Sequence, residues 1–470
     1  MPSPETLRDA TRDALATALR HELTPAFIRD AMTPHLAKYR ARVLTIEVVT
    51  FCLLELVLRG LPSLRALVRR LRLGTLASVA ATRVTDGAFY QRLIVLPHAA
   101  FLALLRRAVH ALPAGPAAYA ARAALAPFAR ALAVIDDTTL DDLARKADLA
   151  ARVGRGKNAT LAGRLGCALD LLTGRLIAVA FDSDAGSNER HRLLPLVDTL
   201  PAGALVVFDR GYLAFDLLAG LNARYLYWLT RWKEGVAYRV AHSLVVTPRY
   251  RDELVWLGSD APGATEALAW PVRRIAVAVA PDVWHVWLTN VWDPQLLPAA
   301  SAARLYEARW SIERAFATLK GALGLATLHA ATLNGLLIQV WCTLLLYQVL
   351  DALRAHVGRA LAAPTDEVSW PLLVEAIAMY AEQPRPAPLA TWLATHARDL
   401  DLHIRQPERR KRFTPDRALA ADLRTPPAPL PLATLAPQRD KRRPSRARPK
   451  PQAYRFFAAI LPPRPCSALN

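Results

Sequence analysis

Apolar residues recur with a helical period across residues 304–323, a stretch without Pro in which the only Gly, Gly321, lies near the end. This period predicts an amphipathic helix. The apolar positions that share one face of it are Leu305, Ile312, Phe316, Leu319 and Leu323.

A narrow polar stripe lies beside that apolar face. Its members are Tyr306, Arg309, Glu313 and Lys320. At about 100° per residue they fall within roughly 60° of one another. In this stripe one acid lies between two cations and a phenol, an arrangement that can hold a carboxylate near phosphates and a metal ion. The alternative is a surface helix with incidental i,i+4 pairs.

Two short apolar runs elsewhere in the chain end in acids. Residues 131–135 lead into Asp136 and Asp137, and residues 204–208 lead into Asp209. A carboxylate pair at the end of a buried strand costs desolvation and repulsion, which a cation offsets. Ligands of α/β sheets gather at the carboxyl ends of strands. We therefore expect acids from separate parts of the chain to converge on one sheet edge.

The remaining pattern divides the chain into segments. An all-α part precedes the strands, a hairpin spans 165–181, and a β-rich stretch with many Trp and Tyr residues separates the second acid from the Glu313 helix. The predicted segments are 1–130 (helical), 131–223 (α/β), 224–293 (β-rich insertion), 294–360 (α/β with the Glu313 helix), 361–402 (helical) and 403–470 (Arg/Pro-rich, disordered).

Two strongly apolar runs, 43–58 and 333–350, are interpreted as buried helices. Each contains acid or amide side chains and falls short of the roughly 20 apolar residues of a membrane span. An integral membrane protein is therefore disfavoured, and no membrane partner is expected.

Composition points to a polyanionic partner. The formal charge is +20, with 60 Lys and Arg against 40 Asp and Glu. Most of the basic residues are Arg, which binds phosphate through two parallel hydrogen bonds. A charge of this size favours nucleic acid, although the Arg, Ala and Pro bias of a GC-rich genome accounts for part of it.

The cysteines indicate neither a zinc site nor a disulfide framework. Cys52, Cys167, Cys342 and Cys466 are far apart in sequence. The first residues do not resemble a signal peptide. We expect a cytoplasmic, nucleoid-associated protein.

Three acids from two strand ends and one helix are the ligands that metal-assisted phosphoryl transfer requires. Two divalent ions about 4 Å apart activate the attacking oxygen and stabilise the leaving one. Oxygen ligands suit Mg²⁺ or Mn²⁺.

The motifs resemble a known family. The Tyr306, Arg309, Glu313 and Lys320 spacing is similar to the YREK signature of bacterial insertion-sequence DDE transposases. The stretch 209–212, Asp-Arg-Gly-Tyr, resembles the family's second-Asp motif, and 135–140 resembles its first. The resemblance runs from about residue 130 to 350.

This resemblance implies a ribonuclease H-like catalytic core with a β insertion, preceded by a helical domain at 1–130 that binds DNA ends. It implies cut-and-paste transposition of the element's own DNA. Asp209 and Glu313 carry over directly as catalytic metal ligands. The first acid is Asp136, which directly follows the strand, or alternatively Asp137, since each has a Thr two residues later.

The resemblance also implies DNA contacts and an assembly. Tyr306, Arg309 and Lys320 would contact terminal phosphates, assisted by Arg210, and Trp284 or Trp287 would receive a flipped base. The partners would be double-stranded DNA, at the element ends and at the target, and a second copy of the chain in a homodimer.

Two other functions compete. A metal-dependent DNA nuclease on the same core would cleave without joining, and the YREK-like helix disfavours it. A non-catalytic DNA-binding relic would have lost an acid, and all three acids are present.

Overall fold

The structure is a computed structural model of the 470-residue chain. It describes residues 9–36, 42–111, 120–140, 142–143, 163–184, 186–259, 266–323, 325, 327–328, 332–363, 365–381, 387–403, 415–435, 441 and 455–463.

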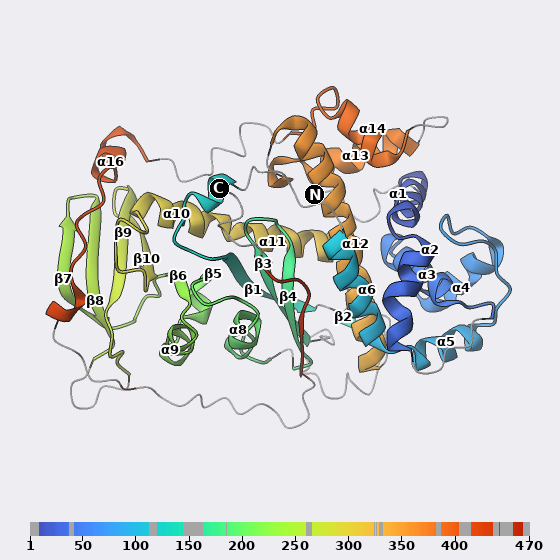
Figure 1. Cartoon of the computed structure of the whole chain (residues 1–470), viewed down its shortest axis with the longest axis horizontal. Helices are drawn as coiled ribbons and strands as arrows, with labels where there is room; N and C mark the ends of the chain where they lie inside the picture. Colours follow the sequence, from blue (N-terminus) through green and yellow to red (C-terminus); the bar gives the residue numbers. More distant parts are fainter. Residues whose placement is uncertain are drawn as a thin grey trace.

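A ten-stranded sheet runs from one end of the molecule, at β7, to the helices α6 and α12 (Figure 1). Its order is β12-β4-β3-β1-β5-β6-β10-β9-β8-β7. The strands nearest the acids are β1 (Leu132–Leu140), β3 (Gly163–Asp170), β4 (Leu176–Asp182), β5 (Leu205–Phe208) and β6 (Tyr227–Arg231). β1 runs antiparallel to β3 and parallel to β5, and β6 runs parallel to β5. The predicted hairpin is β3 and β4, joined by a turn that Asp170 stabilises.

The β-rich segment extends this sheet. Its strands are β7 (Tyr238–Val246), β8 (Tyr250–Leu257), β9 (Val272–Ala280) and β10 (Val283–Thr289). They pair antiparallel with one another, and β10 pairs with β6. β6 lies within the segment 224–293 that the sequence predicts to be an insertion, but it pairs parallel with β5 and continues that part of the sheet. A separate two-stranded sheet pairs β2 (Asp142–Leu143) with β11 (Thr327–Leu328).

Helices cover both faces of the sheet. α8 (Arg190–Val197) and α9 (Phe215–Ala223) pack on one face, while α10 (Ala299–Ala308) and α11 (Trp310–Ala317) cross the other (Figure 1). The strand side chains alternate accordingly. Leu132 and Val134 of β1 belong to the core under α10 and α11, whereas Ala133 and Ile135 belong to the core under α8 and α9.

The predicted helix over 304–323 is present but interrupted. α10 ends at Ala308, α11 begins at Trp310, and a π-helical turn follows at Thr318–Ala322. Arg309 keeps helical dihedral angles between the two helices, with φ −53° and ψ −36°. Its backbone N–H donates to the carbonyl of Tyr306, three residues earlier, as in a 3₁₀ helix.

The N-terminal part is helical, as predicted. Its helices are α1 (Asp9–Glu22), α2 (Pro25–Met32), α3 (Ile46–Leu58), α4 (Leu64–Leu73), α5 (Asp86–Val95), α6 (His98–Ala111) and α7 (Ala120–Ala123), with a 3₁₀ turn at Thr33–His35. Side-chain oxygens cap four of the helix starts. The capping residues are Thr24, Thr45, Ser63 and Thr85.

Both apolar runs are buried helices, as predicted. α3 is buried along almost its whole length. α12 (Leu333–Leu361) is long and apolar enough to cross a membrane, but its most apolar stretch is entirely enclosed by the rest of the protein, as in the core helix of a globular domain. α13 (Trp370–Ala381) and α14 (Leu389–His396) follow it, after a 3₁₀ turn at Thr365–Glu367.

The prediction of a disordered tail over 403–470 is wrong for part of it. α16 (Arg417–Asp422) and a 3₁₀ turn at Leu432–Thr434 form there, and β12 (Arg455–Ala459) pairs antiparallel with β4. The reason is local: Phe456, Ala458 and Ile460 alternate with outward positions and pack into the core. Apart from Lys441, the predicted basic runs at 405–412 and 439–450 and the predicted Gly-containing loop at 152–158 lie outside the described residues.

Candidate active site

Strand alternation places the predicted acids on one face of the sheet. Asp136 follows Ile135 on β1, so its side chain points to the side of Val134, under α10 and α11. Asp209 directly follows β5, and by the same alternation it lies on the side of Val207, in that same core. Glu313 projects from α11, which crosses this face. Asp136 and Asp209 are therefore neighbours, each one residue beyond Ile135 and Phe208, the last pair of the parallel ladder between β1 and β5, although β1 itself continues to Leu140.

Arg309 joins two of these acids. Its guanidinium lies 3.0 Å from Asp136 Oδ2 and 2.6 Å from Glu313 Oε1. The Arg309 side chain is 7% exposed, so this ion pair is largely shielded from water. Burial alone would lower the pKa of Arg309, but Tyr306, Glu313 and Asp136 raise it above the usual value.

Tyr306 holds the third acid. Its hydroxyl donates to Asp209 Oδ1 at 2.9 Å. Burial, and then the negative charge of Asp209, raise the pKa of Tyr306 well above its usual value, so the phenol remains a donor. Two members of the polar stripe therefore contact the acids of the two strand ends.

Burial and the neighbouring charges shift the pKa of Asp136. Burial raises the pKa of Asp136 to about 6 from 3.8, and the charges of Glu313 and Asp209 add to the rise. The Asp137 N–H, which donates to Asp136 Oδ1 at 2.8 Å, and the charge of Arg309 act in the opposite direction. This shift is the cost of gathering three carboxylates in a partly buried place.

Asp137 lies on the opposite side of the sheet, toward α8. Its fully buried carboxylate forms ion pairs with Arg192 and, at 2.8 Å, with Arg164. Arg192 also approaches Asp182 at 3.5 Å, and Asp182 binds Arg455 at 3.1 Å. Each Asp137 oxygen is thus bound to an arginine. These ion pairs link β1 to β3 and to α8.

The remaining predicted residues differ in exposure. Arg210 is exposed, directly after Asp209 in a 3₁₀ turn, and Lys320 is half-buried in the π-helical turn after α11. Trp284 is half-buried, with the Arg251 guanidinium 5.3 Å from its ring centroid. Trp287 is 3% exposed and belongs to the core. Of the two tryptophans, only Trp284 therefore has a surface available for stacking.

Sequence reasoning assigned no role to several arginines at the site. Arg164 and Arg192 neutralise Asp137, and Arg231, half-buried at the end of β6, is close enough to lower the pKa of Tyr306. No short motif marks them. Their signal is spatial, since β3, α8 and β6 bring them to the acids only in the folded chain.

The donor chemistry fits a hard divalent cation, because Asp136, Asp209 and Glu313 supply carboxylate oxygens on one side of the sheet, around Arg309 and Tyr306. Across the described residues, however, no three His, Cys, Asp or Glu side chains lie close enough together to hold a metal as they are placed. Arg309 and Tyr306 occupy oxygens that a cation would require.

Comparison with known proteins gives a family match over the α/β part of the chain. The profile of a protein family described as "Transposase DDE domain" matches residues 130–349. A curated protein of Sinorhizobium fredii, named "Putative transposase y4zB", is 22% identical over 218 residues, which cover 43% of this chain and 57% of that protein. This chain thus matches somewhat more than half the length of that relative.

A solved structure, the piggyBac transposase in a synaptic complex with hairpin DNA, resembles the chain with a TM-score of 0.42 at 9% identity. The superposition covers 87% of this chain and 84% of that one. The YREK signature itself stays a prediction. DDE transposases as a family use divalent metal ions. Residues 130–349 thus match the family of transposase DDE domains, in agreement with the resemblance that the sequence indicated.

Proposed function

We propose that the protein is a DNA transposase that cleaves the ends of its own insertion sequence and joins them to target DNA by a cut-and-paste route. The observation that carries this proposal is the meeting of Asp136, Asp209 and Glu313 on one face of the sheet, linked by Arg309 and Tyr306. The DDE domain match over 130–349 supports the same reaction class.

The layout of strands supports a ribonuclease H-like core. Three antiparallel strands, β4, β3 and β1, continue into the parallel strands β5 and β6, and helices cover both faces. The insertion β7–β10 enters between Asp209 and the Glu313 helix, as the resemblance implies.

Asp136, Asp209 and Glu313 would hold two Mg²⁺ or Mn²⁺ ions. When bound, such ions activate the attacking water or 3′-hydroxyl and stabilise the leaving oxygen. Arg309 and Tyr306 bond to these carboxylates, so a cation that takes the same oxygens would displace them. The freed guanidinium and phenol then become available to phosphates of the DNA end.

Other contacts of the DNA follow from exposure. Arg210 is exposed beside Asp209 and suits a phosphate, as does Lys320 one turn beyond α11. Trp284 is the better candidate for stacking on a flipped base, because Trp287 is buried. Residues 1–130 would bind the element ends, and two copies of the chain would bring both ends together in the bacterial cytoplasm.

Strand transfer tests the proposal. The purified chain is incubated with Mg²⁺ and linear DNA carrying the element's own ends, beside Glu313→Gln and the matched control Glu375→Gln, an exposed acid of α13. We expect cleavage and joining by the parent and by Glu375→Gln, and neither by Glu313→Gln.

Two outcomes contradict the proposal in different ways. Cleavage without joining by the parent indicates a metal-dependent nuclease. Binding without cleavage, equal in parent and Glu313→Gln, indicates a DNA-binding relic and removes the catalytic assignment.

A further inference from the structure

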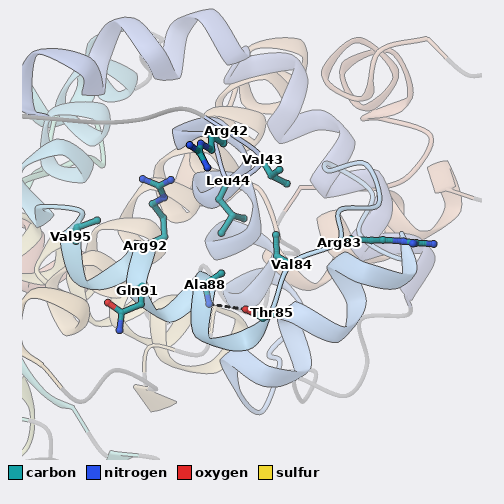
Figure 2. A pocket seen from close by; sticks show the side chains of 10 residues that line it. All are labelled: Arg42, Val43, Leu44, Arg83, Val84, Thr85, Ala88, Gln91, Arg92 and Val95. Atoms are coloured by element: carbon teal, nitrogen blue, oxygen red, sulfur yellow. Dashed lines mark hydrogen bonds between the residues drawn. The ribbon is translucent and has the colours of Figure 1, made fainter.

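A hollow of about 510 Å³ lies in the N-terminal helical part, away from the acids. Segments 42–44 and 83–85 and one face of α5 line it (Figure 2). We call it the α5 hollow. Its polar side chains are Arg42, Arg83, Gln91, Arg92 and Thr85.

The hollow is positively charged. Three arginines line it and no acid does. Arg42 and Arg92 lie toward one side of it and Arg83 toward the other (Figure 2). The side chains of Arg42 and Arg83 are exposed and make no hydrogen bond or ion pair with any described residue. Two guanidinium groups are therefore available to an external anion.

The nearest acid of α5 does not neutralise them. Asp86 turns to α4, where its carboxylate lies 2.7 Å from Arg72 and 3.2 Å from Arg65. The start of α5 is also occupied, because the Ala88 N–H donates to Thr85 Oγ1 at 3.1 Å (Figure 2). Anion binding in the hollow must therefore rest on the arginines rather than on the helix terminus.

The rest of the lining is apolar and unusually exposed. Val43 is 54% exposed and Val95 is 65% exposed, over a floor that includes the buried Leu44. Exposed apolar side chains beside arginines and an exposed Gln91 form a surface with the chemistry of DNA readout. Arg binds phosphate, Gln pairs with adenine edges, and apolar side chains contact thymine methyl groups.

We infer that the α5 hollow is a binding site for double-stranded DNA, with Arg42, Arg83 and Arg92 on phosphates and with Gln91 and Val95 toward base edges. This inference rests on the proposed function and names the surface by which residues 1–130 hold the DNA. A free phosphate ester offers the same anionic chemistry, so the test must separate the two sources.

The test measures binding of the full chain to a duplex carrying the element's ends, by fluorescence anisotropy without Mg²⁺, between 50 and 200 mM salt. The variant is Arg42→Ala with Arg83→Ala. The control, Arg239→Ala with Arg398→Ala, removes two exposed arginines from β7 and from the segment after α14. Losing two phosphate contacts should lower the slope of log affinity against log salt by about 1.8. We expect affinity at least about tenfold weaker for the variant, and within about twofold of the parent for the control.

Equal losses in variant and control would overturn the inference. If the parent binds and joins ends while the variant matches the control, the assignment of the α5 hollow is wrong but the proposed function stands. If the parent binds no DNA at all, the proposed function falls as well. Inorganic phosphate that raises the unfolding temperature of the parent but not of the variant, with unchanged DNA affinity, assigns the hollow to a free anion and overturns the DNA assignment.

A second variant isolates base readout. Gln91→Ala leaves the charge intact, so we expect an unchanged salt slope but a smaller preference for the element's ends over a scrambled duplex. An unchanged preference would remove Gln91 from base contact.

Discussion

At the scale of single residues, Arg309 takes the place of a cation among the acids. It is in contact with both Asp136 and Glu313, and its charge lowers the pKa of Asp136, which burial and the charges of Glu313 and Asp209 raise. The same guanidinium therefore stabilises the metal-free fold and competes with metal for the same oxygens.

We expect Arg309→Gln to bind Mn²⁺ about tenfold more tightly, because a positive charge in contact with two carboxylates is removed. Isothermal titration calorimetry or the EPR signal of free Mn²⁺ measures this in the absence of DNA. Arg210→Gln, which removes an exposed arginine beside Asp209, is the control and should change affinity less. Equal or weaker Mn²⁺ binding by Arg309→Gln would show that the ion pair does not compete with metal.

Asp136→Asn should stabilise the metal-free protein. The native pKa of Asp136, about 6, lies above its ordinary 3.8. The folded state therefore holds a proton that the unfolded chain releases, and the free energy of unfolding falls as pH rises between about 4 and 6. The cost is at most about 3 kcal/mol above that window. Thermal unfolding with EDTA should show a higher midpoint for Asp136→Asn at pH 7.5 and no gain near pH 4.

Asp137→Asn is the matched comparison on the same strand, and its expected effect has the opposite sign. It leaves Arg164 and the buried Arg192 without their shared carboxylate. Breaking a buried pair costs about 3–5 kcal/mol. A lower unfolding midpoint for Asp136→Asn than for Asp137→Asn would contradict our assignment, in which Asp136 destabilises the metal-free protein and Asp137 stabilises it.

At the scale of elements, β12 protects one edge of the sheet. It pairs along β4. The ring centroids of Phe456 and of Trp341 in α12 lie 5.5 Å apart. Arg106 of α6 donates a hydrogen bond to the Ala459 carbonyl at 2.7 Å. The strand thus fills a position between the sheet and the helical part.

Removing residues 455–470 should expose the hydrogen-bonding edge of β4, whose strand is buried and apolar. We expect a chain that aggregates at micromolar concentration, because an unpaired apolar edge is a template for further strands. Light scattering after size-exclusion chromatography measures this. Removal of residues 464–470 alone, which keeps β12, is the control. A monodisperse shortened chain would show that β12 is dispensable.

Much of the α/β part could be predicted from the sequence, because its signals are local. Apolar runs that end in acids predicted β1 and β5, and helical spacing predicted the polar stripe of Tyr306, Arg309 and Glu313. The choice between Asp136 and Asp137 remained open, since it depends on which sheet face the Glu313 helix covers. β12 was missed because an Arg- and Pro-rich surrounding hides five residues whose partner is far away in sequence.

At the scale of the whole molecule, the tail connects to both ends of the sheet. Asp416, before α16, lies 2.7 Å from Arg249 between β7 and β8, and Lys441 pairs with Ala267 near β8 and β9. β12 then adds to the opposite edge (Figure 1). The described residues of the last part of the chain therefore contact the β-rich segment, β4 and the helices α6 and α12.

This arrangement has a consequence in time. Asp182 of β4 and its partner Arg455 of β12 are 273 residues apart. At roughly 5–20 residues per second, a ribosome synthesises β12 about 14–55 s after β4, whose edge β12 pairs with. During that interval the nascent chain carries an open strand edge, so a slowed or truncated translation should leave a chain that requires chaperones before it can reach any DNA.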